Sequence, residues 1–202
     1  MTHGIALALA LLSLPSLALA QAAPAATAPA AAVTEQSPDM IYAAALGRGL
    51  TAVRAGDRGG AIAAFREAVQ LQPSRPDAVC FLAEAQRASG DLAAALEGFQ
   101  ACARVARGWS HHDAQRWVAR GLHGAASTLE RMGPERQAEA RTAWQEYVRF
   151  ADGAAQVSSP AIGRARVTAI DQVTELERVT AEVRERIAAR AAQAQSSPPP
   201  SR

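Results

Sequence analysis

The sequence offers one cluster of side chains that could ligate a metal, formed by His111, His112, Asp113 and His123. If this segment is helical, His112 and His123 lie three turns apart, about 16 Å at 1.5 Å per residue, which is too far for one ion. Adjacent side chains point to different sides of a helix, so His111 and His112 would also diverge. We therefore expect solvated histidines near the start of a helix and no metal site.

Catalytic motifs are missing from the sequence. It contains no nucleophile-elbow motif, phosphate-binding loop, CxxC or HExxH. Its 21 basic residues nearly balance 19 acidic ones, and a net charge of +2 gives no field that would attract nucleic acid. These features favour a protein that binds another macromolecule over an enzyme, and they predict no cofactor.

The N-terminal residues predict export. An uncharged run from Ile5 to Leu14 is followed by Pro15 and by Ala18-Leu19-Ala20, which is the order found in a secretory signal peptide. The run is too short for a transmembrane helix. We predict a signal peptide at 1–20, then an Ala- and Pro-rich disordered linker at 21–38. The basic residues are all arginine and alanine is abundant, which suggests a GC-rich bacterial genome and a periplasmic destination without membrane insertion.

The remaining chain shows helical periodicity and an internal repeat. Apolar residues recur three and four apart, and the alternation typical of strands is missing, so we predict an all-α fold. Gly56, Ala61 and Phe65 recur 34 residues later as Gly90, Ala95 and Phe99, each glycine being followed by aspartate. An ordinary alanine-rich helical bundle is the alternative interpretation, but two consecutive units that agree at one displacement argue against it.

The spacing and residue types of this repeat resemble the tetratricopeptide repeat. The resemblance implies stacked pairs of antiparallel helices, with about three repeats within 39–152, at about 40–72, 75–106 and 110–151. Alanines would allow the two helices of a hairpin to touch, phenylalanines would fill the space beside them, and Gly56 and Gly90 would end the first helices with a positive φ. In the third, divergent unit the matching positions include Gly133, Ala140 and Trp144.

A long amphipathic helix is predicted at 160–193, before a Pro-rich disordered tail at 194–202. We expect its first half to cap the last repeat, as a solenoid requires. Its second half could be a solvated helix, or it could project as a coiled-coil or partner helix. The apolar stripe consists of Ala169, Val173, Leu176, Thr180, Val183 and Ile187.

The resemblance also implies a binding groove, because the first helices of tetratricopeptide repeats line a concave face. One end of this groove is predicted to be apolar and the other mixed in charge, which would suit an extended or helical peptide with an apolar and a polar segment. The corresponding positions are Leu46, Leu50 and Val53 in the first unit, Asp77, Cys80, Glu84 and Arg87 in the second, and Arg120, His123, Ser127 and Glu130 in the third.

Two cysteines, Cys80 and Cys102, fall in the second unit. In an antiparallel hairpin that turns near Gly90 they lie at the same end, and in an oxidising compartment this favours a disulfide. The repeat register, however, directs Cys80 toward the groove and Cys102 toward the hairpin interior, whereas a disulfide needs converging side chains. A disulfide and a pair of buried thiols both remain open.

The sequence thus predicts a periplasmic adaptor or scaffold that binds a peptide or protein of the cell envelope. Two alternatives remain. The protein could be a structural one that associates with itself through the C-terminal helix, or an accessory subunit of an envelope enzyme or transport complex.

Overall fold

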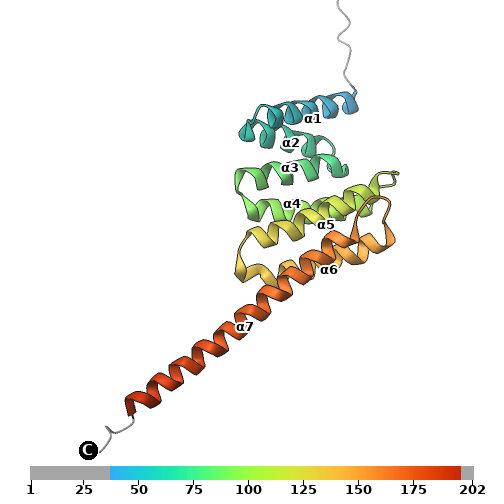
Figure 1. Ribbon diagram of the computed structural model, residues 1–202. Coiled ribbons are helices and arrows are strands. Elements are labelled where there is room, and N and C mark those ends of the chain that lie inside the picture. Colours follow the sequence, from blue (N-terminus) through green and yellow to red (C-terminus); the bar gives the residue numbers. More distant parts are fainter. Residues whose placement is uncertain (1–36, 197–202) are drawn as a thin grey trace, which may run out of the picture. The chain divides into compact units, whose positions relative to one another are not determined.

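The computed structural model describes residues 37–196, and all regular structure in that range is helical (Figure 1). The predicted leader, most of the predicted linker and the last six residues lie outside the described residues. The all-α prediction is confirmed. The elements are α1 (Pro38–Arg54), α2 (Arg58–Leu71), α3 (Pro76–Ser89), α4 (Leu92–Arg107), α5 (Ala114–Arg131), a 3-10 turn η1 (Pro134–Arg136), α6 (Gln137–Gly153) and α7 (Pro160–Ser196).

The first six α-helices form three consecutive hairpins that stack on one another. Each helix packs against the next one in the chain (Figure 1). The first helices of the second and third hairpins, α3 and α5, also contact each other. This is the solenoid of three repeats, with a long C-terminal helix, that the sequence predicts.

The repeated Gly-Asp pair both ends one helix and begins the next. Gly56 and Gly90 have φ values of 74° and 94°, a conformation that glycine adopts without steric strain. Asp57 then accepts a hydrogen bond from the Gly60 amide at 2.8 Å, and Asp91 accepts one from the Ala94 amide at 3.1 Å. These aspartates are N-caps, which explains why the glycine and the aspartate recur together.

Small residues allow the helices to approach closely. Ala61, Phe65, Ala95 and Phe99 are all buried. In the first hairpin, a Cβ atom added to Gly49 would overlap the ring of Phe65, so the ring can pack there only because residue 49 is a glycine. The neighbouring Arg48, where a bulky apolar residue is usual, is exposed and pairs with Glu67 at 2.6 Å.

The third hairpin differs from its predicted bounds. Its first helix begins at Ala114 after a short loop, not at 110. Gly133 has a φ of 118°, and Ala140 and Trp144 are buried. Two other predicted boundaries also differ from the structure. Helix α1 already begins at Pro38, and α7 continues to Ser196, three residues past 193.

The first part of α7 covers the last hairpin. Gly163 and Ile170 are buried against α6, and a Cβ atom on Gly163 would come within 2.6 Å of Val148. Arg141 of α6 pairs with Asp171 at 2.5 Å. Past Ile170 the helix continues as a single element beyond α6 (Figure 1), and its apolar side chains there are exposed.

None of the helices in the described range has both the length and the apolar character needed to cross a membrane.

Replacing Ala95 by leucine should destabilise the protein, because Ala95 is fully buried in the core shared with Ala83 and Phe99. Overpacking of this kind typically costs ~1–3 kcal/mol of unfolding free energy, measurable by urea denaturation. The matched control is Ala93→Leu on the exposed side of the same helix, which should change stability little. Equal stabilities for the two variants would contradict the close crossing at Ala95.

Candidate functional site

The predicted groove positions on α1 differ in exposure. Leu46 and Leu50 are half-buried and pack against the core of the first hairpin. Val53 is 53% exposed and offers most of its side chain to solvent. These three positions therefore offer less accessible apolar surface than the sequence indicates.

Asp77 and Cys80 are not groove residues, because both are buried. Asp77 accepts a hydrogen bond from the Tyr42 hydroxyl at 2.5 Å and pairs with Arg75 at 2.9 Å. The Arg75 guanidinium also lies 4.5 Å from the centroid of the Tyr42 ring. Burial and the Asp77 carboxylate raise the pKa of Tyr42, so Tyr42 remains a hydrogen-bond donor. Asp77 thus fastens α1 to α3 and does not face a ligand.

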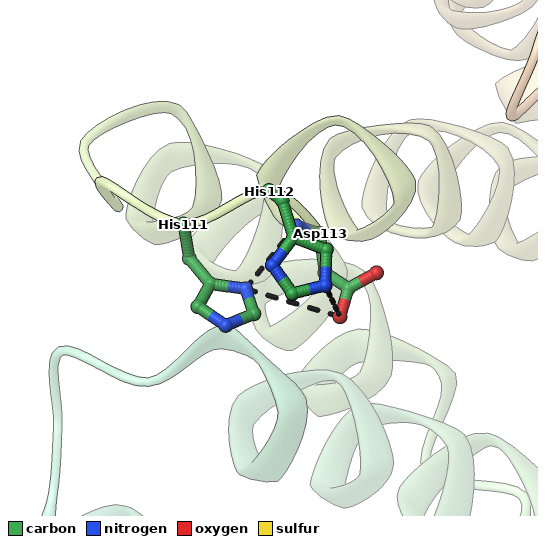
Figure 2. Close-up of side chains that lie close together, drawn as sticks. All are labelled: His111, His112 and Asp113. Atoms are coloured by element: carbon green, nitrogen blue, oxygen red, sulfur yellow. Dashed lines mark hydrogen bonds and ion pairs between the residues drawn. The ribbon is translucent and has the colours of Figure 1, made fainter.

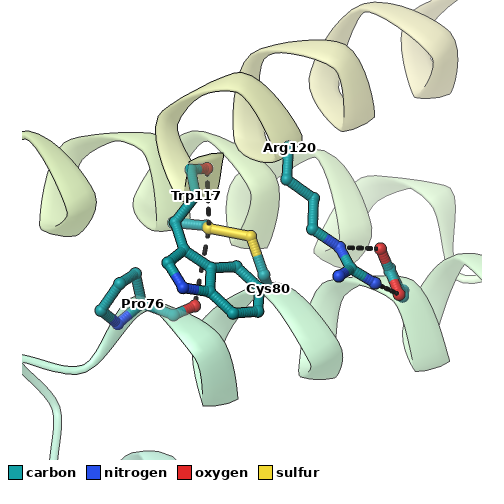
Figure 3. The surroundings of a disulfide bond; sticks show 6 residues. Pro76, Cys80, Trp117 and Arg120 are labelled. Atoms are coloured by element: carbon teal, nitrogen blue, oxygen red, sulfur yellow. Dashed lines mark hydrogen bonds and ion pairs between the residues drawn. A yellow bond between two sulfur atoms is a disulfide. The ribbon is translucent and has the colours of Figure 1, made fainter. Parts of the chain in front are cut away.

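Cys80 and Cys102 form a disulfide between α3 and α4, with Cα atoms 5.2 Å apart (Figure 3). Both residues are fully buried, and Val79 and Trp117 pack around them. Of the two possibilities that the sequence leaves open, the structure has the bridge. Cys80 faces the interior of its hairpin and not the groove. The two cysteine side chains therefore converge, contrary to what the repeat register predicts.

An ion pair supported by aromatic rings forms the centre of the face made by α1, α3 and α5, which we call the A-face. Arg120 of α5 donates two hydrogen bonds of 2.7 Å to Glu84 of α3 (Figure 3). Its guanidinium lies 4.9 Å from the ring centroid of Phe81 and 5.3 Å from that of Trp117. Phe81 in turn stacks on Phe65 at 5.5 Å and meets Trp117 edge-on at 5.5 Å.

Phe81 and Trp117 are functional candidates that the sequence analysis missed. A signal for them existed, because Phe81 lies three residues before Glu84, and Trp117 lies three residues before Arg120. Residues three apart share a helix face. Both rings are half-buried, so the A-face has an aromatic centre between its apolar and charged ends.

Arg87 lies one turn further along α3, beside Ser127 of α5. It donates a 2.8 Å hydrogen bond to the Ser127 hydroxyl, and its guanidinium lies 4.9 Å from the centroid of the Phe99 ring. Partial burial lowers the pKa of Arg87, and the nearby Glu84 charge acts in the opposite direction. Arginine keeps its charge under such conditions, so Arg87 is a cation that is bonded to a neutral hydroxyl.

His123 and Glu130 mark the far end of the A-face and are only partly accessible. The His123 ring packs edge-on against Trp144 and Tyr147, at centroid distances of 5.2 and 5.7 Å. Burial, followed by the positive charge of Arg87, lowers the pKa of His123. Glu130 accepts hydrogen bonds from the Trp144 indole and from Arg166 of α7. The C-terminal helix therefore reaches this end of the face.

The histidine cluster has a geometry that differs from the expected one. His111, His112 and Asp113 lie in the loop before α5 and not on a helix, and the two imidazole rings are neighbours with centroids 4.1 Å apart (Figure 2). Their three possible ligand atoms lie within 4.8 Å of one another. However, His111 Nδ1 already accepts the Asp113 amide at 3.1 Å, and Arg116 lies 3.5 Å from the Asp113 carboxylate. A cation bound through His111 Nδ1 would have to displace the Asp113 amide.

Residues 52–114 match the family model of the tetratricopeptide repeat, so this part of the chain is identified as tetratricopeptide repeat. The matched region runs from the end of α1 to the start of α5, so it contains the second hairpin in full. No curated protein matches the chain. The predicted family is confirmed, and the repeats form a protein–protein interaction module.

The disulfide should stabilise the protein when it is isolated from an oxidising compartment. It joins residues 22 apart in sequence, and the chain-entropy model gives a stabilisation of ~3 kcal/mol for such a loop. Thermal unfolding with and without reductant should therefore show a lower Tm under reducing conditions. A Cys80→Ser/Cys102→Ser variant should be insensitive to reductant. Two free thiols in the unfolded, unreduced protein would exclude the bond.

His123 should make the folded state less stable in mild acid. Because its folded-state pKa is lowered from 6.5, the stability gained by keeping it neutral is fully present above pH 6.5 and is lost as the pH falls below it. In NMR spectra, the imidazole resonance that is missing from His123→Gln belongs to His123. In the wild-type protein this resonance should titrate with a pKa below 6.5. Between pH 7 and pH 5, the free energy of unfolding of His123→Gln should fall less than that of the wild-type protein. An unchanged pH dependence would show that His123 is not held neutral.

Proposed function

We propose that this protein is an exported adaptor of the bacterial cell envelope, which binds a peptide segment of a partner protein along its A-face. The observation that carries the proposal is the accessible Arg120 side chain, 40% exposed, which lies over Phe81 and Trp117 at the centre of that face. Aromatic and arginine side chains held rigidly in this way are typical of protein-binding surfaces.

The face favours a peptide with an apolar segment and an acidic residue. Val53 and the partly accessible Leu50 offer apolar contacts on α1. Arg120 is already neutralised by Glu84, whereas Arg87 is bonded to a neutral hydroxyl and can take a carboxylate from a partner. Phe81 and Arg87 are about 9 Å apart along α3, the length of about three residues of an extended peptide.

Two features support an exported location. Residues 1–20 have the order of a secretory leader, and the Cys80–Cys102 disulfide suits an oxidising compartment better than a reducing one. Together they favour the periplasm of a bacterium, where the partner would be a protein of the cell envelope.

Binding explains the A-face better than catalysis does. Its titratable side chains are paired with one another or packed on rings, as in Glu84 with Arg120 and Glu130 with Arg166. A nucleophile activated by a neighbouring base would need a different arrangement. An accessory subunit of an enzyme or transport complex could use the same face, and the identity of the captured partner distinguishes this case.

Site-specific photo-crosslinking tests the proposal. A photoreactive amino acid at Val53 on the A-face should give a discrete crosslinked species in the periplasm of the source bacterium. The same residue at Gln100, exposed on α4, serves as the control and should not give that species. N-terminal sequencing of the periplasmic chain should start at Gln21. The same crosslinked pattern from both positions would contradict the A-face as the binding site.

Arg87→Ala should weaken binding of the captured partner, because a hydrogen bond to a charged group contributes ~1.5–3 kcal/mol, or roughly ten- to a hundredfold in Kd. Arg66→Ala, on the exposed side of α2, is the matched control and should leave Kd unchanged. Equal affinities for the two variants would show that Arg87 does not contact the partner.

A further inference from the structure

The second half of α7 carries an exposed apolar stripe that nothing in the last hairpin covers. Leu176 and Ile187 are 66% and 63% exposed, and Val173 and Val183 are 45% and 47% exposed. With Thr180 they follow one another at intervals of three, four, three and four residues. This 3.5-residue period is the heptad pattern of a coiled coil, with Val173, Thr180 and Ile187 at a and Leu176 and Val183 at d.

The stripe is suited to another helix of the same kind. Its a and d positions supply two residues per heptad, as in a coiled-coil seam, and Val179, 41% exposed, adds an apolar side chain at the adjacent g position. The Thr180 hydroxyl donates a hydrogen bond to the carbonyl oxygen of Leu176 at 2.7 Å. Thr180 can therefore be buried in a coiled-coil seam without leaving its hydroxyl group unpaired. Arg178 pairs with Glu175 and Glu182 on the opposite face, away from the stripe.

The charges of this segment argue against a membrane surface as the partner. Residues 171–190 contain five acidic residues and four arginines. A helix that lies on anionic lipid has a polar face rich in basic residues. The near balance of charge points to a protein helix instead.

The order of these charges favours a second copy of the same helix as the partner. Residues 171–180 hold three acids and one arginine, a net charge of −2, whereas residues 181–190 hold two acids and three arginines, a net charge of +1. Two copies of the helix therefore attract each other when they run in opposite directions. In a parallel pair, like-charged halves lie together, and Arg190 at a d position meets Arg190 of the second copy.

The positions that flank the stripe agree with this orientation. Glu177 and Arg184 occupy the e positions, and in residues 37–196 neither enters an ion pair within the chain. In an antiparallel pair e faces e, so Glu177 of each copy lies on the same edge as Arg184 of the other. In a parallel pair e faces g, and the two g residues that Glu177 and Arg184 would meet, Gln172 and Val179, carry no charge.

We propose that the protein forms a homodimer through an antiparallel coiled coil of residues 173–190 of α7. The register that joins the largest apolar residues places Leu176 of one copy opposite Ile187 of the other, and Thr180 opposite Val183. Val173 then faces the aliphatic part of Arg190. A hollow of about 270 Å³ between α7 and the η1 turn, lined by Val173 and Glu177 among others, can take side chains of the second helix near its end.

Cysteine crosslinking tests the orientation as well as the association. In the proposed register residue 176 lies opposite residue 187 and about 16 Å along the axis from its own counterpart, at 1.5 Å per residue. Leu176→Cys and Ile187→Cys are made separately in the full chain, with different tags, and treated with a short bismaleimide. Each variant alone should give no crosslinked dimer, whereas a mixture should give the heterodimer. The native cysteines are bonded to each other and do not react.

A dimer crosslinked by Leu176→Cys alone would overturn the proposal, since it indicates a parallel pair or a shifted register. Light scattering supplies the second measurement. The full chain should have the mass of a dimer, and Leu176→Asp/Ile187→Asp should reduce it to a monomer with unchanged unfolding of the repeats. Ala181→Asp/Ala188→Asp, on the outer face of the same helix, is the control and should remain dimeric. A monomeric wild type would also overturn the proposal. Neither experiment depends on the A-face, so its outcome is independent of the peptide-binding function.

Discussion

The close approach of helices at residues that lack a large side chain is the constraint on which this structure depends. Phe65 fits because Gly49 carries no Cβ atom, and Phe99 fits because Gly124 carries none. At Gly121 a Cβ atom would come within 2.8 Å of the Phe99 carbonyl oxygen, so α5 lies directly on the backbone of α4. Each phenylalanine thus fills a space that a neighbouring glycine leaves.

The same packing makes the A-face a rigid surface. Trp117 lies against the disulfide that joins α3 to α4, and Phe81 is held between Trp117 and Phe65. Arg120 can remain over both rings because Glu84 holds it from the other side. A partner would meet side chains that are already ordered, so less conformational entropy is lost when it binds.

The C-terminal helix links the repeats to a second surface. Its first part covers the last hairpin, and Arg166 reaches Glu130, which also holds Trp144 in the core. Its second part has no such support and exposes apolar residues. A solenoid needs a cap on its last repeat. Only the first few turns of α7 serve as that cap. The remaining turns are therefore available for an interaction that is separate from the A-face.

By itself the sequence determined the features that depend on local periodicity. The 34-residue displacement, the Gly-Asp pairs and the alternation of alanine with phenylalanine identified the hairpins and the family, because helix ends and close crossings demand those residue types. Only the tertiary structure decided which way individual side chains face. One residue along a helix turns a side chain by about 100°, so a small rotation of α3 buries Asp77 and Cys80 and brings Phe81 to the A-face. The paired histidines, likewise, lie in the loop before α5, so the spacing of residues on a helix could not show that their rings are neighbours.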